Sequence, residues 1–204
     1  MSFDLKLHAY RLLMDEPFFA ALSRKVEKRA STAIPTAGVM VNPDTAQFEM
    51  IYNPEFFASL PEEQVKGVLK HEFYHLIFEH VTSRKPEGVP HMAWNVAADL
   101  AINSHLVGEL PEMACMPGVG PFADLPKGES AEWYLANLPQ KDETEGGEGG
   151  ESSESGGEPG EPGEGEPGSF DDHSGWSEDG DSPAQEAANQ MAKQRLKEAL
   201  KEAA

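Results

Sequence analysis

Two segments of the chain each carry a single row of polar residues inside an apolar helical pattern, and this pair limits the possible folds more than any other feature. The first segment, residues 68–80, reads VLKHEFYHLIFEH and contains His71, Glu72 and His75. The second, residues 91–108, reads HMAWNVAADLAINSHLVG and has a polar side chain at every fourth position: His91, Asn95, Asp99 and Asn103. Burying such groups without partners is costly. We therefore expect the two rows to face each other inside the fold.

The spacing of the first row is typical of a metal site. Successive helical residues turn by about 100°, so His71 and His75 lie one turn apart and about 40° from each other around the helix. Both imidazoles can then bind one Zn²⁺, which commonly takes two histidines, a third protein ligand and a water. Glu72 follows the first histidine and can accept a proton from that water. We predict one Zn²⁺ per chain with Glu72 as general base; the alternative is a polar row that serves solvent or salt bridges.

The third metal ligand is expected from the second row. Asp99 is flanked by apolar residues, and an ionised carboxylate there needs a cation to offset its burial. His91 is the next candidate. The alternative for Asp99 is an ion pair with an arginine, or capping by Asn95 and Asn103, which are also candidates for hydrogen bonds behind the metal ligands.

Four further residues are candidates for supporting roles or are excluded by geometry. His80 follows His75 by five residues, about 140° around the helix, and is therefore expected to face away from the site. A bend directly after His75 could bring it back, but no Gly or Pro lies between the two histidines. Glu79 lies one turn beyond His75 and is expected to orient it from behind. Tyr134 and His173 are candidates for the donor that stabilises a developing oxyanion. The alternatives are packing for Tyr134 and a solvated loop position for His173.

The rest of the chain up to residue 138 predicts a small α+β fold. Apolar spacing indicates one kinked helix or two short helices over residues 4–30. Two β-prone runs, residues 38–41 and 47–52, are separated by a turn signal and predict a hairpin. The fold class expected is therefore mostly helical with a small hairpin or sheet.

Boundaries of the later helices can be proposed from capping and breaking residues. Ser59 with Glu62 three residues later matches a capping box, which would start the helix bearing the first polar row. That helix is expected to stop near residues 81–85, because prolines and a glycine follow. The stretch ESAEWYLANL, residues 129–138, predicts one more short helix.

The net charge of −20 is concentrated in one stretch. Residues 139–182 hold fifteen acidic residues and one lysine, which gives them a charge of −14, and they are rich in Gly, Glu and Pro. The stretch lacks the apolar residues that would offset the entropy of ordering, so we predict a disordered linker that contains the short motif SFDDHSGW. The chain then divides into a folded domain over residues 1–138 that bears the two polar rows, this linker, and a C-terminal helix over residues 183–204 that is exposed or awaits a partner.

Composition also excludes several classes of protein. A strong negative field repels phosphate backbones, so direct binding to nucleic acid is not expected. The single cysteine, Cys115, rules out an intramolecular disulfide and a Cys-rich zinc module. The N-terminus lacks the apolar core of a signal peptide, and no stretch reaches membrane-spanning length. We therefore expect a cytoplasmic protein that does not associate with membranes.

Three stretches, VLKHEFYHLIFEH, WNVAADLAIN and SAEWYLANL, resemble in order and spacing a metallopeptidase domain of bacterial and phage proteins that often precedes a von Willebrand factor A-like domain. The likeness covers roughly residues 33–138, and SFDDHSGW also resembles that family. It implies a zincin-like fold with a small sheet whose edge strand can take an extended peptide. It further implies zinc bound by His71 and His75, Glu72 as base, and work alongside an AAA-type ATPase.

These observations favour a zinc-dependent peptidase that hydrolyses peptide bonds of a peptide or protein substrate by metal-activated water. Two alternatives come from other functional classes. One is a catalytically inactive, zinc-stabilised interaction module that docks a partner such as an AAA-type ATPase. The other is an acidic nucleic-acid mimic, in which the folded part presents residues 139–182.

Overall fold

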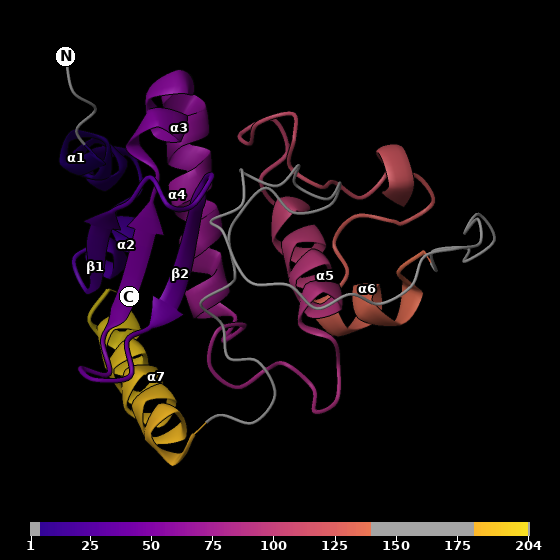
Figure 1. The fold of residues 1–204 in the computed structure, drawn as a ribbon. Coiled ribbons are helices and arrows are strands. Elements are labelled where there is room, and N and C mark those ends of the chain that lie inside the picture. The colour runs from indigo at the N-terminus through magenta and orange to yellow at the C-terminus, as the bar shows by residue number, and fades with distance from the viewer. Residues whose placement is uncertain (1–4, 140–181, 204) are drawn as a thin grey trace, which may run out of the picture.

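The computed structural model describes residues 5–139 and 182–203 as a mostly helical fold with one small sheet (Figure 1). The elements in chain order are α1 (Leu5–Asp15), α2 (Pro17–Ser23), β1 (Val26–Ala30), β2 (Ala37–Val41), β3 (Phe48–Tyr52), α3 (Pro54–Ser59), α4 (Glu62–Ile77), α5 (His91–Asn103), the 3₁₀ turn η1 (Gly120–Phe122), α6 (Ala131–Asn137) and α7 (Pro183–Ala203). The predicted α+β class is confirmed. None of the helices in the described ranges combines the length and apolar character needed to cross a membrane.

The three strands form one sheet in the order β1-β3-β2. β2 and β3 are antiparallel, with Val41 paired to Phe48, which confirms the predicted hairpin. Asn42 shapes the turn between them, because its Oδ1 accepts hydrogen bonds from the backbone N–H groups of Asp44 (3.0 Å) and Thr45 (3.2 Å). β3 is therefore the central strand, and β1 and β2 are the edges of the sheet.

The prediction of helix throughout residues 4–30 is wrong at its end, because the last five of these residues form β1. The helical part does divide in two, and α2 ends at Ser23. β1 then pairs in parallel with β3 along its whole length. Glu, Lys and Arg are good helix formers, but pairing with a neighbouring strand outweighs that weak preference. Lys28 supports the change of direction, since its Nζ donates to the backbone carbonyls of Ser23 (2.5 Å) and Val26 (3.0 Å).

The capping box predicted for the start of α4 is also wrong. The N-cap residue of α4 is Pro61, and no side-chain hydrogen bond caps it. Ser59 closes the preceding helix, since its Oγ donates to the backbone carbonyl of Phe56 (2.7 Å) at the end of α3. α4 ends at Ile77, earlier than predicted. The short helix expected before residue 139 is confirmed as α6.

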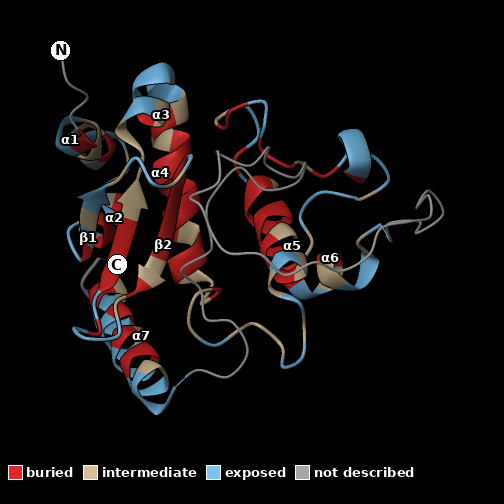
Figure 2. Ribbon diagram, viewed as in Figure 1, coloured by how far each residue is buried: buried red, intermediate tan, exposed pale blue. Residues whose placement is uncertain are grey.

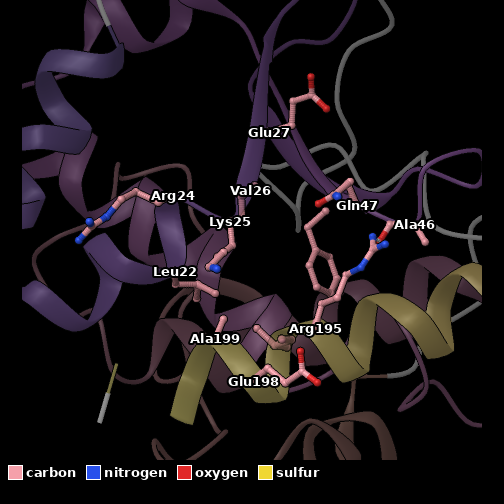
Figure 3. A pocket seen from close by; sticks show the side chains of 12 residues that line it. Leu22, Arg24, Lys25, Val26, Glu27, Ala46, Gln47, Arg195, Glu198 and Ala199 are labelled. Carbon is pink, nitrogen blue, oxygen red and sulfur yellow. Dashed lines mark hydrogen bonds between the residues drawn. The ribbon is translucent and has the colours of Figure 1, made fainter. Parts of the chain in front are cut away.

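The C-terminal helix α7 packs against the rest of the fold, so the expectation of an exposed helix is wrong. Its buried face, which contacts α2 and β2, combines the polar Asn189 with small or medium apolar residues: Ala188, Ala192, Leu196 and Ala199. Arg195 Nη1 donates to the backbone carbonyls of Thr45 (3.1 Å) and Ala46 (2.7 Å), beside a pocket shown in Figure 3. Lys193 Nζ lies 2.5 Å from the carboxylate of Glu79. A thin apolar stripe is sufficient here because small side chains let the helix approach closely and polar anchors add to the contact.

The apolar core has two parts. One packs the sheet against α1, α2, α4 and α7, and the other joins α5 to α6 around Trp94, Leu100 and Tyr134. α4 and α5 are buried along most of their length (Figure 2). Except for the half-buried His91, their polar rows are buried with them, where the two parts of the core meet. These buried polar side chains are therefore where a functional site is expected.

Gly67 lets the chain after α5 approach α4 closely. A Cβ at this position would lie 1.9 Å from the backbone oxygen of Glu109 and 2.7 Å from its carbonyl carbon. Glu109 is held there by an ion pair with Lys70, one turn further along α4. Because the neighbouring atoms belong to the backbone, no side-chain rotation can relieve the overlap.

We expect Gly67→Ala to lower the free energy of unfolding by on the order of 2–3 kcal/mol, measured by urea denaturation. The helical preference for alanine over glycine, about 1 kcal/mol, acts in the opposite direction and is outweighed. Gln64→Ala, at a half-buried position of the same helix, is the control and should change the free energy by less than about 1 kcal/mol. A Gly67→Ala variant as stable as wild type would contradict the close approach.

Candidate metal centre

The two polar rows face each other in the structure. α4 supplies His71 and His75, α5 supplies Asp99, and all three side chains are fully buried. The Nε2 atoms of the two histidines are 2.9 Å apart. Asp99 Oδ1 lies 3.2 Å from Nε2 of His75 and 3.7 Å from Nε2 of His71. Three atoms of the kinds that bind metal ions therefore meet at one place in the core.

The spacing of these three atoms fits one metal ion. Zinc binds imidazole nitrogen at about 2.0–2.1 Å and carboxylate oxygen at about 2.0–2.2 Å, so a tetrahedral arrangement places neighbouring ligand atoms about 3.3–3.4 Å apart. The measured separations of 2.9, 3.2 and 3.7 Å lie on both sides of that value. The donor set fits as well, because two imidazoles and one carboxylate leave a coordination position for water.

Asn103 fixes which nitrogen of His71 is protonated. Its Nδ2 donates to the backbone carbonyl of Cys115 (2.8 Å), and its Oδ1 lies 2.7 Å from Nδ1 of His71. Because an amide oxygen only accepts, Nδ1 of His71 carries the hydrogen and its Nε2 presents a lone pair toward Asp99 and His75. Asn103 therefore lies directly behind a candidate ligand and contacts it, the role that its position on α5 predicts.

Glu72 follows His71 on α4 and is also fully buried, with an exposed fraction of 0 %. Carboxylates are almost never buried to this extent unless another group compensates them. The helix that carries both histidines thus also carries a potential proton acceptor in the same water-poor environment. Such a group next to a metal site has the chemistry of a general base.

His80 lies against His75, so the expectation that it faces away from the site is wrong. Its Nδ1 is 3.3 Å from Nδ1 of His75, and its side chain is only 2 % exposed. The expectation assumed a continuing helix, whereas α4 ends at Ile77. The N–H of His80 then donates to the carbonyl of His75 (2.9 Å) and that of Glu79 to Leu76 (3.0 Å), the bond pair of a Schellman motif.

The backbone of Glu79 makes this turn possible. It has a φ of 60°, in the left-handed region that glycine usually fills at the end of a helix. Because the residue is not glycine, no glycine signal in the sequence marks the turn. This turn brings the residue after Glu79 back onto the face of His75.

The prediction that Glu79 itself orients His75 is wrong. Its carboxylate lies 2.5 Å from Lys193 Nζ and accepts a hydrogen bond from Ser83 Oγ (3.2 Å). Burial raises the pKa of Glu79, but the bonds from Lys193 and Ser83 outweigh this effect, and the net pKa lies below its ordinary value. Glu79 therefore connects the end of α4 to α7, and the position behind His75 is occupied by His80.

Tyr134 is a packing residue in the structure, which agrees with the alternative interpretation of this position. The ring is fully buried between α5 and α6. Its hydroxyl donates to the backbone carbonyl of Pro126 (2.7 Å) and lies 3.0 Å from Ser104 Oγ. These contacts hold the phenol inside the second part of the core.

The remaining candidates lie outside the three-residue cluster. His91, the second candidate for third ligand, lies two turns before Asp99 on α5, and its Nδ1 is 3.2 Å from Nδ2 of Asn95. Asn95 is buried one turn before Asp99. His173 and the motif SFDDHSGW lie outside the described residues, as does the predicted linker except for its two end residues.

The pocket of about 410 Å³ in Figure 3 is separate from this centre. It is bordered by the end of α2, the start of β1 and the last turns of α7. Its charged lining includes the cationic Arg24, Lys25 and Arg195 and the acidic Glu27 and Glu198. These charges largely offset one another, so the lining does not define one class of ligand.

Fold and site together define a class: an α+β protein with a buried cluster of two histidines and one aspartate that could hold a metal ion. A family model described as "Putative metallopeptidase domain" matches residues 2–204, so the chain belongs to that family. The family predicted from the three sequence motifs is thereby confirmed. The chain is also similar to an "Uncharacterized protein" of Thermotoga maritima, with 30 % identity over 70 residues that cover 34 % of this chain and 17 % of that protein. No solved structure gives a significant match.

Proposed function

We propose that this protein is a zinc-dependent peptidase in which Glu72 is the general base. The observation that carries the proposal is the convergence of His71, His75 and Asp99 in the core, with two of them on the helix that bears the buried Glu72. Membership of a metallopeptidase family supports the same conclusion. The substrate class that follows is a peptide or protein.

Each residue of the centre has a distinct task in this proposal. His71 and His75 through Nε2, and Asp99 through a carboxylate oxygen, would hold the ion. Zinc bound there would act as a Lewis acid, which polarises a peptide carbonyl and lowers the pKa of a water to about 7. Glu72 takes the proton of the attacking water and returns it to the nitrogen of the leaving amine, so that the amine departs neutral.

Zinc is proposed over other metals because of Glu72. Two histidines and one carboxylate also suit Fe²⁺ in oxygenases, so the ligand set alone leaves both metals open. In contrast to the reaction of an oxygenase, hydrolysis of a peptide bond needs a group that accepts a proton from the attacking water and donates one to the leaving amine. The buried carboxylate next to His71 fits that requirement.

We further propose a zincin-like arrangement in which the substrate lies along an edge of the sheet. β2 is an edge strand and contacts α4, the helix that bears the candidate ligands. An extended peptide can add to such an edge through main-chain hydrogen bonds. This placement rests on the family resemblance together with the position of β2.

Removal of the metal should abolish hydrolysis and leave the fold in place. We expect the protein, mixed with a library of unstructured peptides, to produce cleavage products by mass spectrometry. Treatment with 1,10-phenanthroline should reduce cleavage to background, and adding Zn²⁺ back should restore it. Circular dichroism before and after chelation is the control for unfolding.

Two outcomes would contradict the proposal. Cleavage that continues unchanged in the metal-free protein would exclude a metal-dependent mechanism. A protein that binds zinc tightly but cleaves no peptide or unfolded protein in the library would favour the zinc-stabilised interaction module instead.

A further inference from the structure

His80 has no task in the mechanism above, yet it lies directly behind a candidate ligand. Its Nδ1 is 3.3 Å from Nδ1 of His75. On the opposite edge of the same ring, Nε2 of His75 faces His71 and Asp99 at 2.9 and 3.2 Å. The imidazole of His75 is therefore held between His80 and the candidate metal position.

His80 is held in place by its backbone and by its neighbours. The Schellman bonds at the end of α4 fix its backbone. The indole Nε1 of Trp94 donates to the carbonyl of His80 (3.4 Å), and the two rings pack edge to face with centroids 5.6 Å apart. The ring of Phe78 lies 5.7 Å from that of His80, centroid to centroid. Such packing keeps the imidazole in one orientation before any ligand binds.

In both candidate ligands from α4, Nε2 faces the candidate metal position and Nδ1 faces another side chain. Nδ1 of His71 has the oxygen of Asn103 at 2.7 Å, and Nδ1 of His75 has the nitrogen of His80 at 3.3 Å. A histidine that binds a metal through Nε2 carries its hydrogen on Nδ1 and needs an acceptor there. A neutral imidazole can be that acceptor through its unprotonated nitrogen.

We propose that His80 is a positioning residue of the metal centre. Its Nδ1 accepts the Nδ1 hydrogen of His75, which keeps Nε2 of His75 unprotonated and directed at the metal. This inference rests on the proposed function in one respect only, that the cluster binds a metal. It does not depend on whether the protein cleaves peptides.

Metal affinity in three variants tests this role, with Co²⁺ as the probe because its visible absorption reports on the ligand geometry. His80→Leu removes the acceptor, and we expect the dissociation constant for Co²⁺ to rise by about 10–100-fold. His80→Asn can place an amide oxygen close to the position of Nδ1, and we expect an affinity within about threefold of wild type. His105→Leu is the matched control, since it makes the same change at an exposed histidine and should bind Co²⁺ like wild type.

Each outcome supports or contradicts a distinct statement. If wild type binds no Co²⁺ or Zn²⁺, the proposed function fails. If wild type binds metal and His80→Leu binds it equally well, or if His80→Asn loses as much affinity as His80→Leu, the positioning role of His80 is overturned and the proposed function stands.

A measurement on wild type covers the case in which His80→Leu does not fold. In the metal-loaded, ¹⁵N-labelled protein, long-range ¹H–¹⁵N correlation spectra distinguish protonated from unprotonated ring nitrogens. We expect the hydrogen on Nδ1 in His75 and on Nε2 in His80. A hydrogen on Nδ1 of His80 would overturn the inference.

Discussion

Glu72→Gln is expected to lower peptide hydrolysis by about 10²–10⁴-fold, the usual contribution of a positioned general base. Glutamine keeps the size and shape of the side chain but cannot take a proton from water. The metal content of the variant should remain that of wild type, because Glu72 is not one of the three converging ligand residues. Turnover and bound metal are therefore measured on the same samples.

The matched control for this prediction is Glu63→Gln, a change of the same kind at an exposed position of the same helix. It should leave both turnover and metal content unchanged. Wild-type turnover in Glu72→Gln, with metal bound, would remove Glu72 from the mechanism. Loss of metal in that variant would instead assign the carboxylate a place among the ligands.

Asp99→Ala is expected to weaken metal binding by more than the roughly 10–100-fold that changes behind a ligand cause. The side chain supplies one of three converging atoms and the only negative charge among them. Removing it leaves two imidazoles, which cannot hold a divalent ion as tightly without a third protein ligand. Competition with a fluorescent zinc indicator gives the dissociation constants of wild type and variant.

Asp124→Ala, which removes an exposed aspartate, is the control for the general loss of a negative charge and should bind metal like wild type. Unchanged affinity in Asp99→Ala would mean that the third ligand comes from elsewhere. In that case the 3.2 Å contact between Asp99 and His75 would be an ion pair within the core.

The convergence of the two polar rows could be predicted from the sequence because it follows from helical periodicity and the cost of burial. His71 and His75 share one face of a helix by their spacing alone. Asp99 lies in an apolar segment, and a buried carboxylate needs a partner. The class of fold and the hairpin followed from equally local patterns.

His80 could not be placed from the sequence, because its position depends on where α4 ends. Rotation by about 100° per residue holds only inside a helix. The helix ends at a turn in which Glu79 has a left-handed backbone conformation, and no glycine in the sequence marks this turn. Helical periodicity therefore predicts Glu79, and not His80, at the position behind His75.

β1 and α7 show that packing against distant parts of the chain also cannot be predicted from local sequence patterns. Residues 26–30 form a strand because β3 is available beside them, which is information from outside the segment. α7 packs through small side chains and through polar contacts such as those of Arg195, whose partners are backbone carbonyls 150 and 149 residues earlier in the chain. Patterns within one helix contain neither kind of contact.

The central claim is that the cluster on α4 and α5 binds one metal ion. The most direct test is elemental analysis of the wild-type protein, purified without chelators, then offered Zn²⁺ and dialysed. We predict one equivalent of zinc per chain. Protein that retains no metal after this treatment would contradict the account, and the buried histidines and carboxylates would then need another explanation.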